Sequence, residues 1–79
     1  MTEILDRISA LLTSRFGVDA AEFRADAMLA DLDLDSLALV EFGLVAEKEF
    51  GIKLADDEVS PKDTVGDLAK LIIAKGAVV

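Results

Sequence analysis

Cysteine and histidine are both absent from the 79 residues of the chain. Without cysteine, neither a disulfide nor a thiolate metal cage can stabilise the fold, so apolar helix packing must do so. The chain also lacks an imidazole base, a thiol nucleophile and a soft metal site, and neither Gly51 nor Gly66 belongs to a phosphate-binding glycine loop. These absences predict that the protein is not an enzyme and has no metal site of its own.

Long apolar runs are missing as well. No run approaches the roughly 20 residues that a membrane span needs, and Met1-Thr2-Glu3-Ile4 lacks the basic segment that opens a secretory signal. A chain of 79 residues is enough for one small hydrophobic core but not for two. We therefore expect a single domain over residues 1–79, monomeric and cytoplasmic.

Basic residues are few, since eight Lys and Arg face sixteen Asp and Glu and the net charge is −8. Twelve of the acidic residues, but only three of the basic ones, lie between Asp26 and Asp67. Such a field repels nucleic acid and anionic membranes, and it steers basic partner surfaces toward the middle of the chain. Solubility alone is the other explanation of the surplus acid.

The apolar spacing predicts four helical segments and no strand. The first covers about residues 3–15, with Ile4, Ile8, Leu11 and Leu12 at helical spacing. A long connection over residues 18–34 follows, and four apolar residues are expected to hold it to the core: Phe23, Met28, Leu29 and Leu32. Residues 55–59 are predicted to form one short acidic helical turn. A capping box at Thr64 and Asp67 opens the last helix, which Gly76 ends.

The second helix is predicted over residues 36–50, with Asp35 as N-cap and Gly51 as the left-handed residue after its end. Its apolar residues are too many for one face: Leu39, Phe42, Ala46 and Phe50 suit one side, and Leu37, Val40 and Leu44 another. The second set either binds a partner or is buried in a wide core. Gly43 lowers helix stability here, and close packing of another element is the expected reason for it.

Asp35-Ser36-Leu37 places one hydroxyl at the start of this helix, between a carboxylate and an apolar side chain. A modified serine explains this setting better than a catalytic one in a chain without histidine. Asp31, Asp33 and Asp35 imitate the opening of a calcium-binding EF-hand loop. That site is excluded because Ser36 stands where the loop needs glycine and Phe42 where it needs glutamate.

Together these motifs resemble the acyl carrier protein family. The resemblance is carried by Leu32-Asp33-Leu34-Asp35-Ser36-Leu37, by Val40-Glu41 and by Glu47-Lys48-Glu49-Phe50-Gly51-Ile52. Asp56-Asp57-Glu58 and Thr64-Val65-Gly66-Asp67 stand where that family has its short third helix and the start of its fourth. The match covers essentially the whole chain. Three positions differ from the common pattern: Asp33 often corresponds to glycine, and Ala38 and Lys48 to acidic residues.

The resemblance implies an all-α, small four-helix bundle with three longer helices, one short helix and a long loop between helices one and two. Ser36 would receive 4′-phosphopantetheine from coenzyme A through a separate Mg²⁺-dependent phosphopantetheinyl transferase. Its oxygen would attack the inner phosphate of the pyrophosphate, and the thiol of the arm would carry acyl groups as thioesters. Asp35 would help to position Mg²⁺ in the transferase complex.

The resemblance also implies a surface that docks on partner enzymes such as ketosynthases and acyltransferases through their basic patches. In this chain it would comprise Asp35, Leu37, Val40, Glu41, Leu44 and Glu47, with Asp56 and Asp57 at its edge. Acyl chains would lie between the helices, lined by Phe42, Ala46, Leu54 and Ile72. Fatty-acid and polyketide pathways both stay open. The alternative from another class is an acidic helical adaptor that uses Leu37, Val40 and Leu44 to bind a partner helix.

Overall fold

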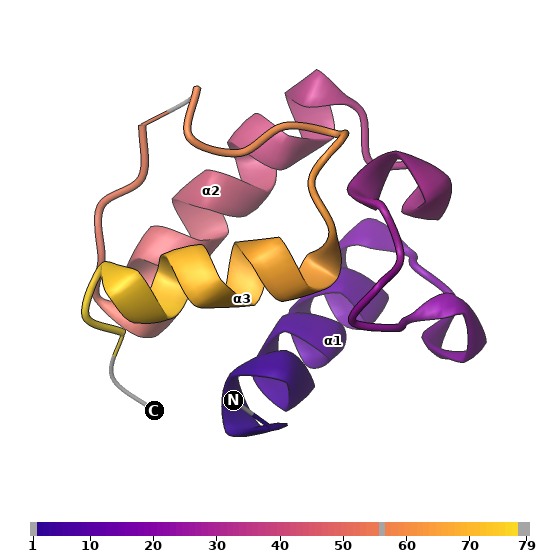
Figure 1. Cartoon of the computed structure of the whole chain (residues 1–79), viewed down its shortest axis with the longest axis horizontal. Coiled ribbons are helices and arrows are strands. Elements are labelled where there is room, and N and C mark those ends of the chain that lie inside the picture. The colour runs from indigo at the N-terminus through magenta and orange to yellow at the C-terminus, as the bar shows by residue number, and fades with distance from the viewer. Residues whose placement is uncertain (1, 56, 78–79) are drawn as a thin grey trace.

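The chain folds into three α-helices joined by turns and short 3-10 helices, as the computed structural model shows for residues 2–55 and 57–77 (Figure 1). The elements are α1 (Thr2–Phe16), η1 (Ala20–Glu22), η2 (Leu29–Leu32), α2 (Ser36–Phe50) and α3 (Val65–Ala74). In the described residues, pairing of the strand type is limited to one isolated bridge between Met28 and Thr64. The predicted all-α class, with a long connection between the first two helices, is confirmed.

The core forms where one apolar stripe of each helix meets the others. The buried residues of the three helices are Ile4, Ile8 and Leu12 of α1, Leu39, Phe42, Ala46 and Phe50 of α2, and Val65, Leu68, Ala69 and Ile72 of α3. Phe16 at the end of α1 packs its ring 5.8 Å from that of Phe42, at a tilted angle that suits an aromatic pair. The apolar face predicted from Leu39, Phe42, Ala46 and Phe50 is confirmed as the inner face of α2.

Both ends of α2 are fixed by the residues that the sequence indicates. The carboxylate of Asp35 accepts a hydrogen bond from the Ala38 N–H, with 2.8 Å between oxygen and nitrogen, and so caps the start of the helix. Gly51 adopts a left-handed conformation with φ of 66°, and its N–H donates to the Glu47 carbonyl. The predicted bounds of the second helix are therefore confirmed.

The long connection between α1 and α2 is held by backbone hydrogen bonds to the segment that leads into α3. The N–H groups of Leu29 and Ala30 donate to the carbonyls of Asp63 and Pro61, at 2.8 and 2.9 Å. In the other direction, the N–H of Val65 donates to the carbonyl of Ala27 at 2.9 Å. This pairing satisfies main-chain groups that a loose loop would leave to water, and it fixes the approach to α2.

Of the four residues expected to hold this connection, Leu29 and Leu32 are buried and Phe23 packs partly buried against the core. The prediction for Met28 is wrong, because its side chain is 38% exposed. Leu34, which was not among the four, is only 2% exposed and supplies the contact next to α2 instead.

The sequence predicts a short helix over residues 55–59, but the described residues of this segment form only a turn. The N–H of Glu58 donates to the Ala55 carbonyl at 3.1 Å, which closes a single turn, and Asp56 lies outside the described residues. The turn ends because Pro61 disfavours helical backbone at Ser60, whose N–H donates to the Asp63 carboxylate at 3.0 Å.

The explanation predicted for Gly43 is wrong, and it applies to Gly66 instead. A Cβ atom built on Gly43 would meet no atom within 4 Å, whereas one on Gly66 would lie 3.1 Å from the Ala25 carbonyl oxygen. That oxygen accepts a hydrogen bond from the Gly66 N–H at 2.8 Å, so it cannot retreat freely. The backbone of the long connection, not a neighbour of α2, is what requires a glycine.

We predict opposite effects for the two matched substitutions. Gly43→Ala should stabilise the fold by about 0.5–1 kcal/mol because alanine loses less backbone freedom in a helix. Gly66→Ala should give no such gain and should instead destabilise by about 1 kcal/mol through overpacking against Ala25. Thermal unfolding of both variants measures this difference. A higher midpoint for Gly66→Ala than for Gly43→Ala would contradict the packing described here.

Candidate functional site

The approach to α2 is built by residues 32–35, which place Ser36 at the first helical position. Asp33 has φ of 62°, and it is the only described residue other than glycine with a positive φ. Aspartate tolerates this left-handed region better than most residues do. Its N–H donates to the Ala30 carbonyl at 3.1 Å, and that of Leu34 donates to the Leu29 carbonyl at 3.2 Å. The left-handed turn and the buried Leu34 together fix the direction in which α2 begins.

The Ser36 side chain is exposed beside a hollow of about 430 Å³. Its lining consists of Ala30, Asp33, Leu34, Asp35, Ser36 and Pro61. Ser14, Ser60 and Thr64 use their side-chain oxygens in hydrogen bonds to nearby main-chain groups, whereas the Ser36 hydroxyl makes none with the described residues. Ser36 therefore combines a free hydroxyl, a fixed backbone and open space for a group attached to it.

The predicted partner-binding residues of α2 fall into two groups. Leu37 and Leu44 are 69% and 62% exposed, and Glu41 is exposed between them. Val40 and Glu47 are half-buried, Val40 beside Leu54 and Val59 and Glu47 beside Leu54. The Glu47 carboxylate accepts a hydrogen bond from the Leu54 N–H at 2.8 Å, so it holds the connector after α2 in place. This structural role of Glu47 was not foreseen.

The four residues predicted to line an acyl pocket are not brought together at one cavity surface. Phe42, Ala46 and Ile72 are at most 1% exposed in the core, while Leu54 is half-buried. Leu54 lines a narrow groove of about 20 Å³ between α2 and the segment that contains Leu54, Ala55 and Val59. The other lining residues are Leu39, Val40, Gly43, Leu44, Ala55 and Val59. Val59 was missed because it is an isolated apolar residue in a polar segment.

One wall of this groove is tied to the end of α3 by Glu58. Its carboxylate accepts a hydrogen bond from the Ala55 N–H at 2.8 Å and lies 2.6 Å from the Lys75 ammonium. The hydrogen bond from Ala55, followed by the bond and charge of Lys75, lowers the pKa of Glu58 below its ordinary value. Glu58 is therefore ionised at neutral pH and links Ala55 to Lys75 at the end of α3. Asp57 is exposed beside it, and the predicted role of Asp56 falls outside the described residues.

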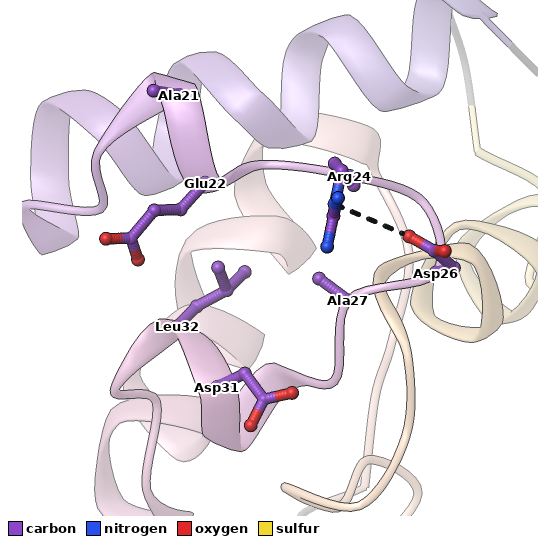
Figure 2. Close-up of a pocket in the computed structure, with 7 residues that line it drawn as sticks. All are labelled: Ala21, Glu22, Arg24, Asp26, Ala27, Asp31 and Leu32. Carbon is purple, nitrogen blue, oxygen red and sulfur yellow. Dashed lines mark ion pairs between the residues drawn. The ribbon is translucent and has the colours of Figure 1, made fainter.

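A second hollow, of about 420 Å³, lies between η1 and η2 and shares no residue with the one at Ser36 (Figure 2). Arg24 points into it, and the guanidinium lies 3.7 Å from the Asp26 carboxylate. Both side chains are more than three-quarters exposed, so this ion pair adds little stability. This hollow could not be predicted from the sequence, because its walls come from segments without helical or strand periodicity.

Neither a carboxylate metal site nor a membrane-spanning helix is found among the described residues. Asp31, Asp33 and Asp35 do not form a site there, since no group of three or more suitable side chains converges in the described part of the chain. Among the residues that the structure describes, no helix is long and apolar enough to cross a bilayer.

Comparison with known proteins agrees with the geometry at the start of α2. The family model described as "Phosphopantetheine attachment site" matches residues 6–72. The acyl carrier protein of Thermobifida fusca (strain YX) is 37% identical over 71 residues, which cover 89% of this chain and 90% of that protein. The chain therefore belongs to the acyl carrier proteins, non-catalytic carriers that hold 4′-phosphopantetheine and work with a modifying transferase and synthase enzymes.

Proposed function

We propose that Ser36 is the residue to which 4′-phosphopantetheine is attached. The observation that carries this proposal is the exposed Ser36 hydroxyl, set by a capped and fixed backbone at the start of a 15-residue helix and beside an open hollow. The site fits the group, because a phosphate ester on Ser36 lies at the positive end of the α2 dipole, where anions are stabilised. The hollow beside it leaves room for an arm to leave the surface.

The chemistry asked of this chain is small, in keeping with its lack of catalytic side chains. The Ser36 oxygen forms a bond to the phosphorus of the pantetheine half of coenzyme A, the bond to the adenosine bisphosphate breaks, and the hydroxyl proton passes to the transferase. Asp35 keeps one oxygen on the Ala38 N–H and has its second available toward Mg²⁺ held in the transferase complex. Once attached, the group supplies a thiol that carries acyl chains as thioesters.

Peptide mapping tests the attachment site directly. The protein is incubated with coenzyme A, Mg²⁺ and a broad-specificity phosphopantetheinyl transferase, then digested, and the modified peptide is sequenced by mass spectrometry. Phosphopantetheine on Ser36 is the expected result. Its presence on Thr13, which is also an exposed hydroxyl without a described hydrogen bond, would overturn the assignment.

The proposed docking surface consists of Asp35, Leu37, Val40, Glu41, Leu44 and Glu47, with Asp57 at its edge. Its support is the exposure of Leu37, Glu41 and Leu44 along α2 and the surplus of acid in the middle of the chain. Charge complementarity to basic patches on ketosynthases, acyltransferases and the transferase speeds association without tight binding, which suits a carrier that visits several enzymes. The same charge disfavours nucleic acid. We also propose that the protein is a cytoplasmic monomer that serves fatty-acid or polyketide synthesis.

Charge reversal separates the two acids of this surface. Glu41→Lys should slow loading by the transferase while the thermal unfolding midpoint stays nearly unchanged, because Glu41 is exposed. Glu47→Lys should slow loading too, but it should also destabilise the fold by about 1–2 kcal/mol, since the Leu54 N–H loses its acceptor. Loading is measured at low salt, where exposed charges act most strongly. Equal loading rates for Glu41→Lys and the unchanged protein would count against the docking surface.

For the acyl chain, we propose that the groove at Leu54 is where it enters between the helices toward Phe42, Ala46 and Ile72. The support is that the groove is lined mainly by apolar residues and shares Leu39 with the core, whereas those three side chains are buried members of the hydrophobic core cluster. Space for an acyl chain there requires the groove to widen. Cross-linking of a photoreactive acyl chain to Leu54 or Val59 is the expected result, and labelling confined to α1 would contradict the proposal.

A further inference from the structure

The outermost line of α2 alternates between apolar and charged side chains. Leu37, Glu41, Leu44 and Lys48 follow one another at intervals of four, three and four residues, which places them on one face of the helix. All four are exposed, on the side opposite the buried Leu39, Phe42, Ala46 and Phe50. The line is about 16 Å long and begins next to Ser36. Its first charge is acidic and its second is basic.

The basic end of this line is joined by a second cation from α1. Arg15, Leu44, Val45, Lys48 and Glu49 line a hollow of about 170 Å³. The carboxylate of Glu49 lies 3.7 Å from the Arg7 guanidinium, which partly compensates its charge. Arg15 and Lys48 are exposed, and neither forms an ion pair with the acids that the structure describes. We call Arg15, Leu44, Val45 and Lys48 the basic hollow.

Glu41 does not neutralise the basic hollow. Lys48 lies seven positions further along the helix than Glu41, a rise of about 10 Å, so the two charges are near one Debye length apart in ordinary buffer. Each charge therefore presents its own field to an approaching surface. The hollow is lined by two cations, by the apolar Leu44 and Val45, and by Glu49, whose carboxylate lies 3.7 Å from the Arg7 guanidinium. The two cations of the hollow therefore fit an acidic side chain accompanied by an apolar one, and a purely basic partner surface would be repelled there.

We propose that the basic hollow is the second half of the docking surface and accepts an acidic side chain from the synthase enzymes that act on the loaded arm. This inference rests on the proposed docking of α2. The partner surface would then be bipolar, with a cation opposite Asp35 and Glu41, an anion opposite Arg15 and Lys48, and apolar contacts for Leu37 and Leu44. Such an arrangement fixes the direction of α2 on the partner, because the reversed orientation would bring like charges together.

The test is the kinetics of acyl transfer to the holo-protein by the acyltransferase of the chain's own host, with its acyl-coenzyme A as donor. In the double variant Arg15→Glu, Lys48→Glu, the KM for the carrier should rise by about fivefold or more with kcat unchanged, and the difference should shrink in high salt. Lys48→Arg, which keeps the charge, should behave like the unchanged protein. Lys70→Glu on α3 is the control for charge reversal away from α2; it changes the net charge by two units, half the change of the double variant, and should leave KM nearly unchanged.

A KM that is unchanged or lower in the double variant would overturn the inference, because docking by acidic residues alone predicts that removing two cations improves association. Intact mass of the same variants reports phosphopantetheine on Ser36. If the double variant receives the arm normally but its KM does not rise, only the inference about the basic hollow fails. If the protein without substitutions receives no arm either, the proposed function itself fails. Lys48→Met, which adds no repulsion, should give a smaller rise in KM, and thermal unfolding verifies that each variant is folded.

Discussion

Ser36→Ala is expected to abolish acyl carrying completely while leaving the fold intact. The Ser36 hydroxyl makes no hydrogen bond within the described structure, and the Asp35 cap that starts α2 does not depend on it. Alanine is also a good helix former, so the free energy of unfolding should change by no more than about 0.5 kcal/mol. Thioester formation from acyl-coenzyme A and thermal unfolding are the two measurements.

Ser14→Ala is the matched control for this substitution. Ser14 is an exposed serine of α1 whose hydroxyl donates to the Ala10 carbonyl within the helix. That variant should carry acyl groups as the unchanged protein does. Residual thioester on Ser36→Ala, or an unfolded Ser36→Ala protein, would be inconsistent with a serine whose only role is to hold the arm.

Phe42→Ala is expected to have the largest effect on stability. Phe42 is 1% exposed, and its ring packs 5.8 Å from that of Phe16. Truncating a buried phenylalanine costs about 3–5 kcal/mol. A chain of this length has a total stability on the order of 4–12 kcal/mol, so the variant should lose a large part of its free energy of unfolding. Chemical denaturation measures the loss.

Leu44→Ala is the control for the same kind of change on the outer face of α2. Because Leu44 is 62% exposed, the free energy of unfolding should move by only about 0.5 kcal/mol, while docking on partners should weaken. Similar stability losses for the two variants would show that the inner and outer faces of α2 have been misassigned.

The helices could be predicted because their limits are set by local chemistry. Asp35 and Gly51 bound α2, and the reciprocal hydrogen bonds of Thr64 and Asp67, both 3.1 Å, open α3. Each of these signals involves residues close together in the sequence. The same holds for Ser36, whose position at the start of α2 follows from the cap that precedes it.

What could not be predicted depends on contacts between distant segments. The backbone pairing of residues 25–30 with residues 61–66 involves N–H and carbonyl groups, which every sequence has, and so leaves no pattern. It decides which glycine is needed, Gly66 rather than Gly43. It also includes the bridge between Met28 and Thr64, where the Met28 side chain remains 38% exposed.

In the candidate site, too, some features follow from local sequence signals and others depend on contacts between distant segments. Exposure of Leu37, Glu41 and Leu44 follows from helical periodicity, but the bond from Leu54 N–H to Glu47 depends on how the chain turns after Gly51. The narrow groove likewise forms only when Val59 and Ala55 fold back beside α2. Its residues therefore become apparent only in three dimensions.

Intact mass spectrometry tests the central claim most directly. The unmodified protein and Ser36→Ala are incubated with coenzyme A, Mg²⁺ and a broad-specificity phosphopantetheinyl transferase. The account predicts that the unchanged protein gains the mass of one phosphopantetheine and that Ser36→Ala gains none. A folded, initially unmodified protein that gains no mass, or a Ser36→Ala variant that gains as much as the unchanged protein, would contradict the assignment of Ser36 as the site of the arm.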